Sequence, residues 1–121
     1  MIKKIAAVYS IVVGISVIVQ WGMTLLTGGI TEGPIEISFH LISEFLMAIL
    51  LLISGIGLLS GKTYGKKVFF ISNGMLIYSV LNAGGYFGQR SNFPMMYMFL
   101  AIFIITSIFL MLGLIRNLDT N

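Results

Sequence analysis

The sequence lacks cysteine altogether and contains few charged residues. The absence of cysteine excludes disulfide bonds, thiolate metal sites and cysteine nucleophiles. Charged residues make up 9% of the chain, against about 25% in soluble domains, whereas 58% of the residues are hydrophobic. So few charged side chains cannot supply the polar surface of a soluble domain of 121 residues. Composition therefore predicts an integral membrane protein, and the length allows a single transmembrane domain over residues 1–121.

The charged residues divide the chain into four long apolar segments. A helix rises about 1.5 Å per residue, so about 20 apolar residues cross a hydrocarbon core about 30 Å thick. We therefore predict an all-α fold, an up-down bundle of four transmembrane helices. The predicted spans are Ile5–Thr27, Ile37–Leu59, Val68–Phe87 and Pro94–Ile115. The first span is longer than the apolar core of a signal peptide, so we expect it to be retained as a helix.

The basic residues lie mostly on one side of the predicted membrane. Two lysines precede the first span, three lysines separate the second span from the third, and Arg116 follows the fourth. The opposite side carries Arg90 together with the acidic Glu32 and Glu36. Because cytoplasmic loops are enriched in Lys and Arg, this asymmetry predicts a multi-pass protein of the cell membrane with both termini in the cytoplasm.

Polar side chains gather in the halves of the spans that this topology places near the outer surface. Polar groups that face lipid without partners cost several kcal/mol, so we expect these side chains to face inward and to line an outward-facing polar cavity. On the third span, Tyr78 and Gly85 share a helical face with three of the candidates. The candidate proton- or ligand-binding residues are Glu44, His40, Glu36, Asn82, Tyr86, Gln89, Gln20 and Thr24.

The most informative pattern is Glu36-x3-His40-x3-Glu44, which places three ionisable side chains on one helical face. Glu44 lies about 10 Å below the predicted start of its helix. A carboxylate at such a depth is costly and is by default a candidate for a functional site. His40, one turn away, is the expected partner of Glu44, since an imidazolium beside a carboxylate lowers the desolvation cost of both.

This cluster is open to four interpretations. It can stabilise the bundle through hydrogen bonds between helices, or carry a proton or cation on Glu44 in coupled transport of a small solute. It can also bind a small polar ligand or lipid headgroup in a non-transporting binding or accessory protein, or hold a divalent metal on His40 and Glu44. Apart from that metal we predict no cofactor. No Ser-His-Asp set and no basic patch beyond the topology is evident, so we predict neither an enzyme nor a nucleic-acid-binding protein.

The segment Gly85-Tyr86-Phe87-Gly88-Gln89-Arg90, followed by Pro94 and a fourth span, resembles the end of the third helix and the next loop of small multidrug resistance transporters. Chain length and number of helices are also similar. That family carries its essential membrane carboxylate in the first helix, whereas here the first span has no acid and Glu44 lies in the second. The resemblance implies a proton-coupled carboxylate in a dimer. We expect a homodimer, because four helices alone hardly enclose a path for a solute.

Overall fold

The computed structural model describes residues 2–28 and 32–115, which form four helices joined by short connections. The helices are α1 (Ile2–Thr27), α2 (Pro34–Leu59), α3 (Thr63–Gln89) and α4 (Phe93–Ile115). All four are long and apolar enough to cross a membrane, which confirms the prediction of four apolar spanning helices. Arg116, one of the basic residues behind the predicted orientation, lies outside the described residues.

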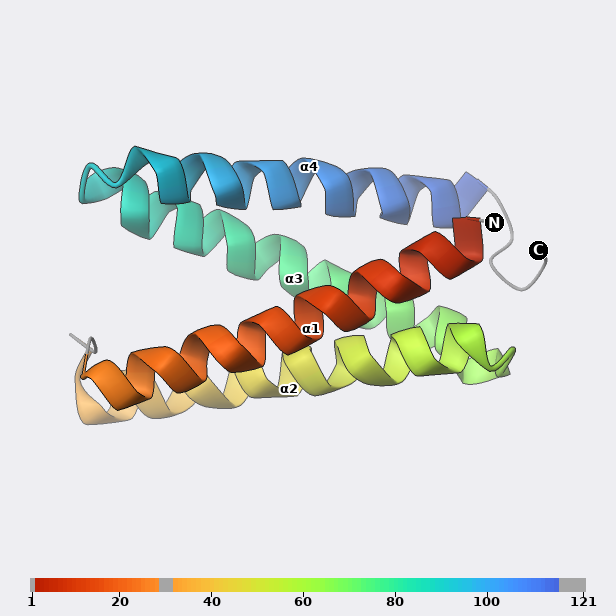
Figure 1. Cartoon of the computed structure of the whole chain (residues 1–121), viewed down its shortest axis with the longest axis horizontal. Helices are drawn as coiled ribbons and strands as arrows, with labels where there is room; N and C mark the ends of the chain where they lie inside the picture. Colours follow the sequence, from red (N-terminus) through yellow and green to blue (C-terminus); the bar gives the residue numbers. More distant parts are fainter. Residues whose placement is uncertain (1, 29–31, 116–121) are drawn as a thin grey trace.

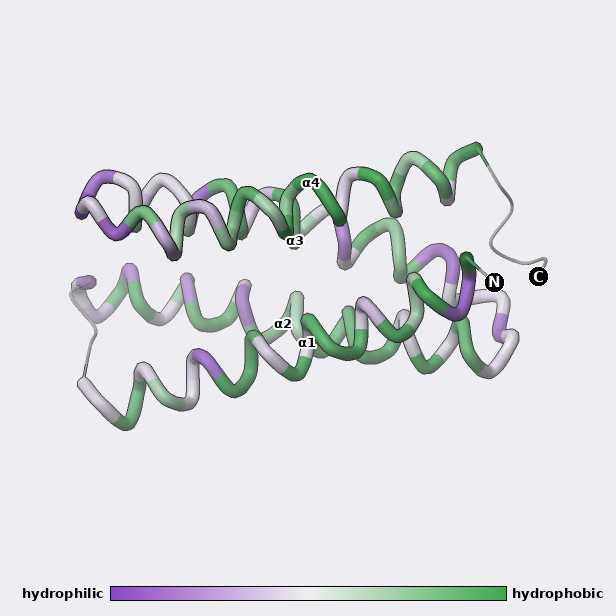
Figure 2. The backbone as a smooth tube through the Cα atoms, turned by 45° about the horizontal axis from the view of Figure 1, so that its top comes forward, coloured by the Kyte–Doolittle hydropathy of each residue, from purple (hydrophilic) through white to green (hydrophobic). Residues whose placement is uncertain are grey.

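Successive helices run antiparallel and form a bundle (Figure 1). The α1–α2 and α3–α4 connections lie together at one end, which we call the two-loop end. The start of α1, the α2–α3 connection and the end of α4 lie at the opposite end, which we call the terminus end. Each helix packs mainly on its neighbours in the chain. Figure 2 shows hydrophilic residues recurring along the first turns of α2, near the two-loop end.

The helix ends follow the residues at the connections. Pro34 occupies the first turn of α2, where its missing N–H costs no hydrogen bond. The side-chain oxygen of Asn92 accepts a hydrogen bond from the backbone N–H of Met95 at 3.4 Å, as the residue before a helix often does. The α3 helix begins at Thr63 rather than at Val68, because helical hydrogen bonding continues through polar residues that a hydropathy criterion excludes from the span.

The bundle core contains two apolar clusters and a buried polar layer. One cluster is centred on Phe69 near the terminus end, and the other, around Met47, Leu76 and Phe99, lies nearer the two-loop end. The polar layer consists of five fully buried side chains: Ser10, Ser54, Ser72, Asn73 and Thr106. Asn73 in this layer donates hydrogen bonds from Nδ2 to the Phe69 carbonyl at 3.0 Å and to Ser10 Oγ at 3.3 Å. It thereby joins α3 to α1.

A second polar contact joins α1 to α4, which are not neighbours in the chain. The hydroxyl groups of Tyr9 and Thr106 lie 2.6 Å apart, and Tyr9 Oη is 3.4 Å from the Ile102 carbonyl. We expect Tyr9→Phe to lower the free energy of unfolding by about 1 kcal/mol, since hydrogen bonds between membrane helices contribute about that much. Thermal unfolding in detergent measures the effect. Tyr97→Phe is the matched control, because this α4 side chain is 63% exposed, and an unchanged Tyr9→Phe protein would contradict the contact.

Candidate functional site

Glu44 is the acidic residue that lies farthest inside an apolar helix among residues 2–28 and 32–115. It follows Pro34 by ten residues, so its Cα lies about 15 Å along α2, a helix about 39 Å long. Glu44 therefore lies farther along its helix than the sequence predicted, because α2 begins before Ile37. A carboxylate near the middle of a membrane helix costs roughly 2.5–3.5 kcal/mol on insertion scales. The residue is only partly buried in the single chain.

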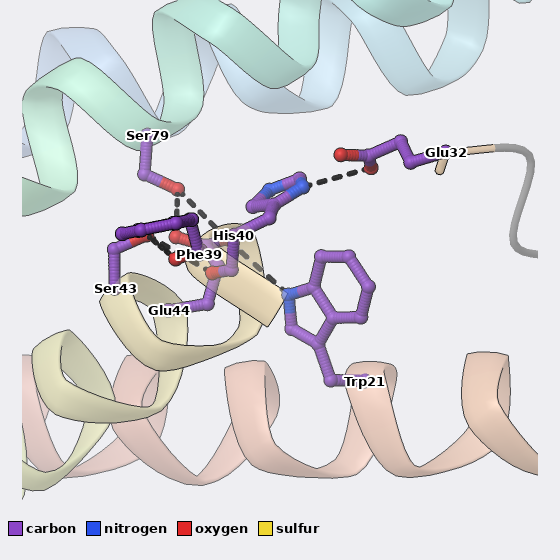
Figure 3. Close-up of polar contacts among 7 residues, drawn as sticks. All are labelled: Trp21, Glu32, Phe39, His40, Ser43, Glu44 and Ser79. Carbon is purple, nitrogen blue, oxygen red and sulfur yellow. Dashed lines mark hydrogen bonds and ion pairs between the residues drawn. The ribbon is translucent and has the colours of Figure 1, made fainter. Parts of the chain in front are cut away.

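Two neutral donors from two other helices hold the Glu44 carboxylate (Figure 3). The hydroxyl of Ser79 in α3 lies 2.8 Å from Oε2 and 3.0 Å from Oε1, so its single proton serves one oxygen at a time. From α1, Trp21 donates its indole N–H to Oε1 at 3.3 Å. The Glu44 side chain therefore joins α1, α2 and α3 at one point.

His40 does not pair with Glu44, and the predicted pairing is wrong. Its Nδ1 instead lies 2.9 Å from Oε1 of Glu32, which precedes α2 in the α1–α2 connection. The two side chains are 36% and 30% exposed, so the pair is open to solvent. The His40 ring also meets the Trp21 ring edge to face, with centroids 4.8 Å apart. Trp21 thus contacts both the His40 ring and the Glu44 carboxylate (Figure 3).

Within the part of the chain that the structure describes, Glu44 has no basic partner. The ion pair found there joins His40 to Glu32. A carboxylate can accept about four hydrogen bonds, and Ser79 and Trp21 supply two donors. The remaining lone pairs of Glu44 can accept a proton, a cation or the N–H groups of a ligand. The Glu44 carboxylate, which has no basic partner and belongs to a partly buried residue, is the chemical centre of the candidate site.

The structure leaves the other predicted site residues outside this centre. Glu36 is exposed in the first turn of α2, where its charge suits the positive end of the helix dipole. Thr24 donates to the Gln20 carbonyl of its own helix at 2.9 Å, and the Gln20 side chain is exposed. The sequence predicts that the polar side chains of α3 face inward. In the single chain this prediction is wrong, because Asn82, Tyr86 and Gln89 are exposed. All three lie on or beside the surface of α3 that its neighbours do not cover.

A comparison with protein families gives one match. The model of a family described as a domain of unknown function, DUF8058, matches the chain over residues 1–121. The chain belongs to the DUF8058 family. No curated protein and no solved structure matches it.

The geometry gives little support to a metal site in the DUF8058 protein. No group of three or more His, Asp or Glu side chains is placed to hold a metal ion within residues 2–28 and 32–115. His40 and Glu44, the two predicted ligands, have different partners. Binding of a divalent metal by these two residues stays a prediction from the sequence.

Sequence reasoning missed three residues of the site: Trp21, Ser79 and Glu32. An aromatic residue near the end of a span is typical of the membrane interface, so Trp21 gives no signal of a contact with an acid, and Glu32 gives none because it lies in a connection. Serine is common in membrane helices, so Ser79 gave no signal by its type. Its position three residues before Asn82 put it close to the polar face of α3, which is the one hint that the sequence offers.

Proposed function

We propose that the DUF8058 protein is a small membrane carrier in which Glu44 alternately binds and releases a proton or a cation, coupled to movement of a small solute. The observation that carries this proposal is the Glu44 carboxylate, deep in an apolar helix and held by the neutral donors Ser79 and Trp21 rather than by a cation. A carboxylate in this position is stabilised when it binds a proton or a cation, because its negative charge is then neutralised. The substrate is thus of a class whose binding competes with, or depends on, protonation of Glu44.

The arrangement also supports coupling between that chemistry and the helices. Ionised Glu44 accepts hydrogen bonds from α1 and α3 at once. A protonated carboxyl group has less acceptor capacity and becomes a donor itself, so protonation changes the contacts that join these helices. A change in protonation state can in this way bias the packing of α2 against its two neighbours.

The proposed setting is the cell membrane, with both termini in the cytoplasm and the two-loop end outside. The support is the distribution of charge: lysines lie in the first turn of α1 and around the α2–α3 connection, all at the terminus end. The two-loop end carries Glu32, Glu36 and Arg90. The Glu44 site would then be reached from the outer side, with His40 and Glu32 at its entrance.

The second candidate function is a non-transporting binding or accessory protein. It is favoured by the fact that the same Glu44 contacts join three helices, as structural hydrogen bonds in a bundle do. In that case the cluster stabilises the fold or binds a small polar ligand or lipid headgroup, and no solute moves. Neither candidate function includes a catalysed reaction.

Proteoliposomes distinguish the two functions. The full chain is reconstituted with an entrapped pH-sensitive dye, and an amine, a carboxylate and a sugar alcohol are added outside in turn. The carrier proposal predicts that at least one class of solute moves protons in the wild type and that Glu44→Gln abolishes this movement. Proton movement that is the same in wild type, Glu44→Gln and empty vesicles for every class would overturn transport and leave the binding or accessory function.

The Ser79 contact gives a finer prediction. In Ser79→Ala the ionised carboxylate of Glu44 loses a donor, and a hydrogen bond to a charged group contributes about 1.5–3 kcal/mol. We expect the rate of solute-coupled proton movement to fall by about tenfold, since the loss of one such bond corresponds to a factor of about ten or more. Ser43→Ala is the matched control, since Ser43 Oγ bonds to carbonyl groups of its own helix. An unchanged rate in Ser79→Ala would show that this contact does not regulate Glu44.

A further inference from the structure

One face of α3 has no neighbour in the single chain. We call it the open face of α3, and it consists of Ile71, Gly74, Tyr78, Asn82, Gly85 and Gln89, which are all exposed. Tyr78 is 72% exposed although it lies in the middle of the helix. The spacing of three or four residues places the six on one continuous stripe. The opposite face of α3, with Phe69, Leu76 and Val80, is buried in the core.

The open face of α3 is poorly suited to contact with lipid because it includes Asn82. The α3 helix is about 40 Å long, so it extends beyond a hydrocarbon core of about 30 Å by roughly 5 Å at each end. Asn82 lies seven residues before Gln89, about 10 Å from the helix end, and hence inside the apolar region. Its side-chain amide makes no hydrogen bond with residues 2–28 or 32–115. An amide left unpaired in hydrocarbon costs several kcal/mol.

The exposed hydroxyl groups of α1 show how a polar side chain is made compatible with lipid. Ser16 donates to the Val12 carbonyl at 2.8 Å, and Thr27 donates to the Met23 carbonyl at 2.9 Å. Each hydroxyl is thus satisfied within its own helix. Asn82 has no such bond with the residues that the structure describes, so its amide is free to bond to a second molecule.

We propose that a second copy of this chain covers the open face, with α3 packed on α3 of the partner about a two-fold axis. The partner is identified by complementarity: an amide both donates and accepts, so Asn82 can bond to its own symmetry mate, as an isologous interface requires. Small residues let helix backbones approach in membranes, and a Cβ atom added at Gly74 or Gly85 meets nothing within 4 Å. No charged side chain interrupts the face between Lys67 and Arg90, so two copies meet without repulsion of like charges.

This interface deepens the proposed function, which expects a dimer, but it rests on observations that do not involve Glu44. It also places the site close to the contact between subunits, because Ser79 follows Tyr78 of the open face directly. Movement of α3 at the interface would be transmitted to the Glu44 carboxylate through the Ser79 hydroxyl. Two such sites would flank the α3–α3 contact in a dimer.

The test measures the fraction of dimer in vesicles by energy transfer as the protein is diluted into lipid. We expect Asn82→Leu and Gly85→Leu each to raise the apparent dissociation constant at least tenfold. The control is Gly22→Leu in α1, which fills an equally open glycine on another helix. Wild type that stays monomeric at every dilution, or Leu variants that associate like wild type, would overturn the interface.

Cross-linking gives a second measurement that does not depend on affinity. The native chain has no cysteine, so single substitutions report one position each. Tyr78→Cys and Asn82→Cys are expected to form disulfide-linked dimers on mild oxidation in vesicles, whereas Gly22→Cys is not. The reverse pattern would place the interface elsewhere. Wild type that stays monomeric but still moves protons through Glu44 would overturn the interface alone, and a dimer without proton movement would overturn the carrier proposal alone.

Discussion

Glu44→Gln is expected to make the protein more stable at neutral pH while abolishing coupled proton movement. Glutamine has the shape of glutamate and can still accept hydrogen bonds from Ser79 and Trp21, but it carries no charge. Removal of a membrane charge without a basic partner should raise the free energy of unfolding by about 1–3 kcal/mol. Thermal unfolding in nanodiscs, at neutral and at acidic pH, measures the difference.

The control for this experiment is Glu36→Gln in the same helix. Glu36 is exposed near the helix start, so its loss should cost no more than about 0.3–1 kcal/mol of dipole stabilisation. A Glu44→Gln protein that unfolds at a lower temperature than wild type at every pH would contradict a functional charge. The contacts of Glu44 would then serve to hold α1, α2 and α3 together, as in the accessory-protein alternative.

Gly65→Ala is expected to destabilise the bundle by about 1–3 kcal/mol, the usual cost of overpacking a close contact. A Cβ atom on Gly65 would lie 2.7 Å from both the carbonyl carbon of Gly57 and the amide nitrogen of Leu58. Both of these atoms belong to the backbone of α2 and cannot rotate away as a side chain can. The helices must separate near their connection, and unfolding in detergent would report the loss.

Gly22→Ala is the matched substitution, because a Cβ atom on Gly22 meets nothing within 4 Å. Alanine is preferred to glycine in a helix by about 0.8–1 kcal/mol, so this variant should be neutral or slightly more stable. Equal stability of Gly65→Ala and wild type would mean that α2 and α3 do not approach as the structure has them.

The helices could be predicted from the sequence because apolar length is sufficient evidence for a spanning helix. Long runs without charge predicted all four, and the predicted ends at Thr27 and Leu59 coincide with those in the structure. The beginnings were less accurate, as at Thr63, where a helix continues through lysines that a hydrophobic span leaves out. Hydropathy measures the part of a helix that prefers lipid, whereas backbone hydrogen bonds determine where the helix begins.

The central residue of the site could be predicted from the sequence, but the side chains that contact it could not. Glu44 was found because a carboxylate in an apolar helix is costly wherever the helix packs. Ser79 and Trp21 could not be assigned, since their approach to Glu44 depends on how α1 and α3 rotate against α2, which helical periodicity leaves undetermined. His40 was paired with the wrong acid because Glu32 lies in a connection, outside the regular spacing on which that prediction depended.

Infrared difference spectroscopy of the reconstituted protein tests directly whether Glu44 changes its protonation state. Difference spectra between acidic and neutral pH are compared for wild type and Glu44→Gln. Proton binding by Glu44 predicts a carbonyl stretch of a protonated carboxylic acid that is present in the wild-type difference spectrum and missing from that of the variant. Identical difference spectra for the two proteins would contradict proton binding by Glu44, because this carboxylate would then hold the same proton, or none, throughout.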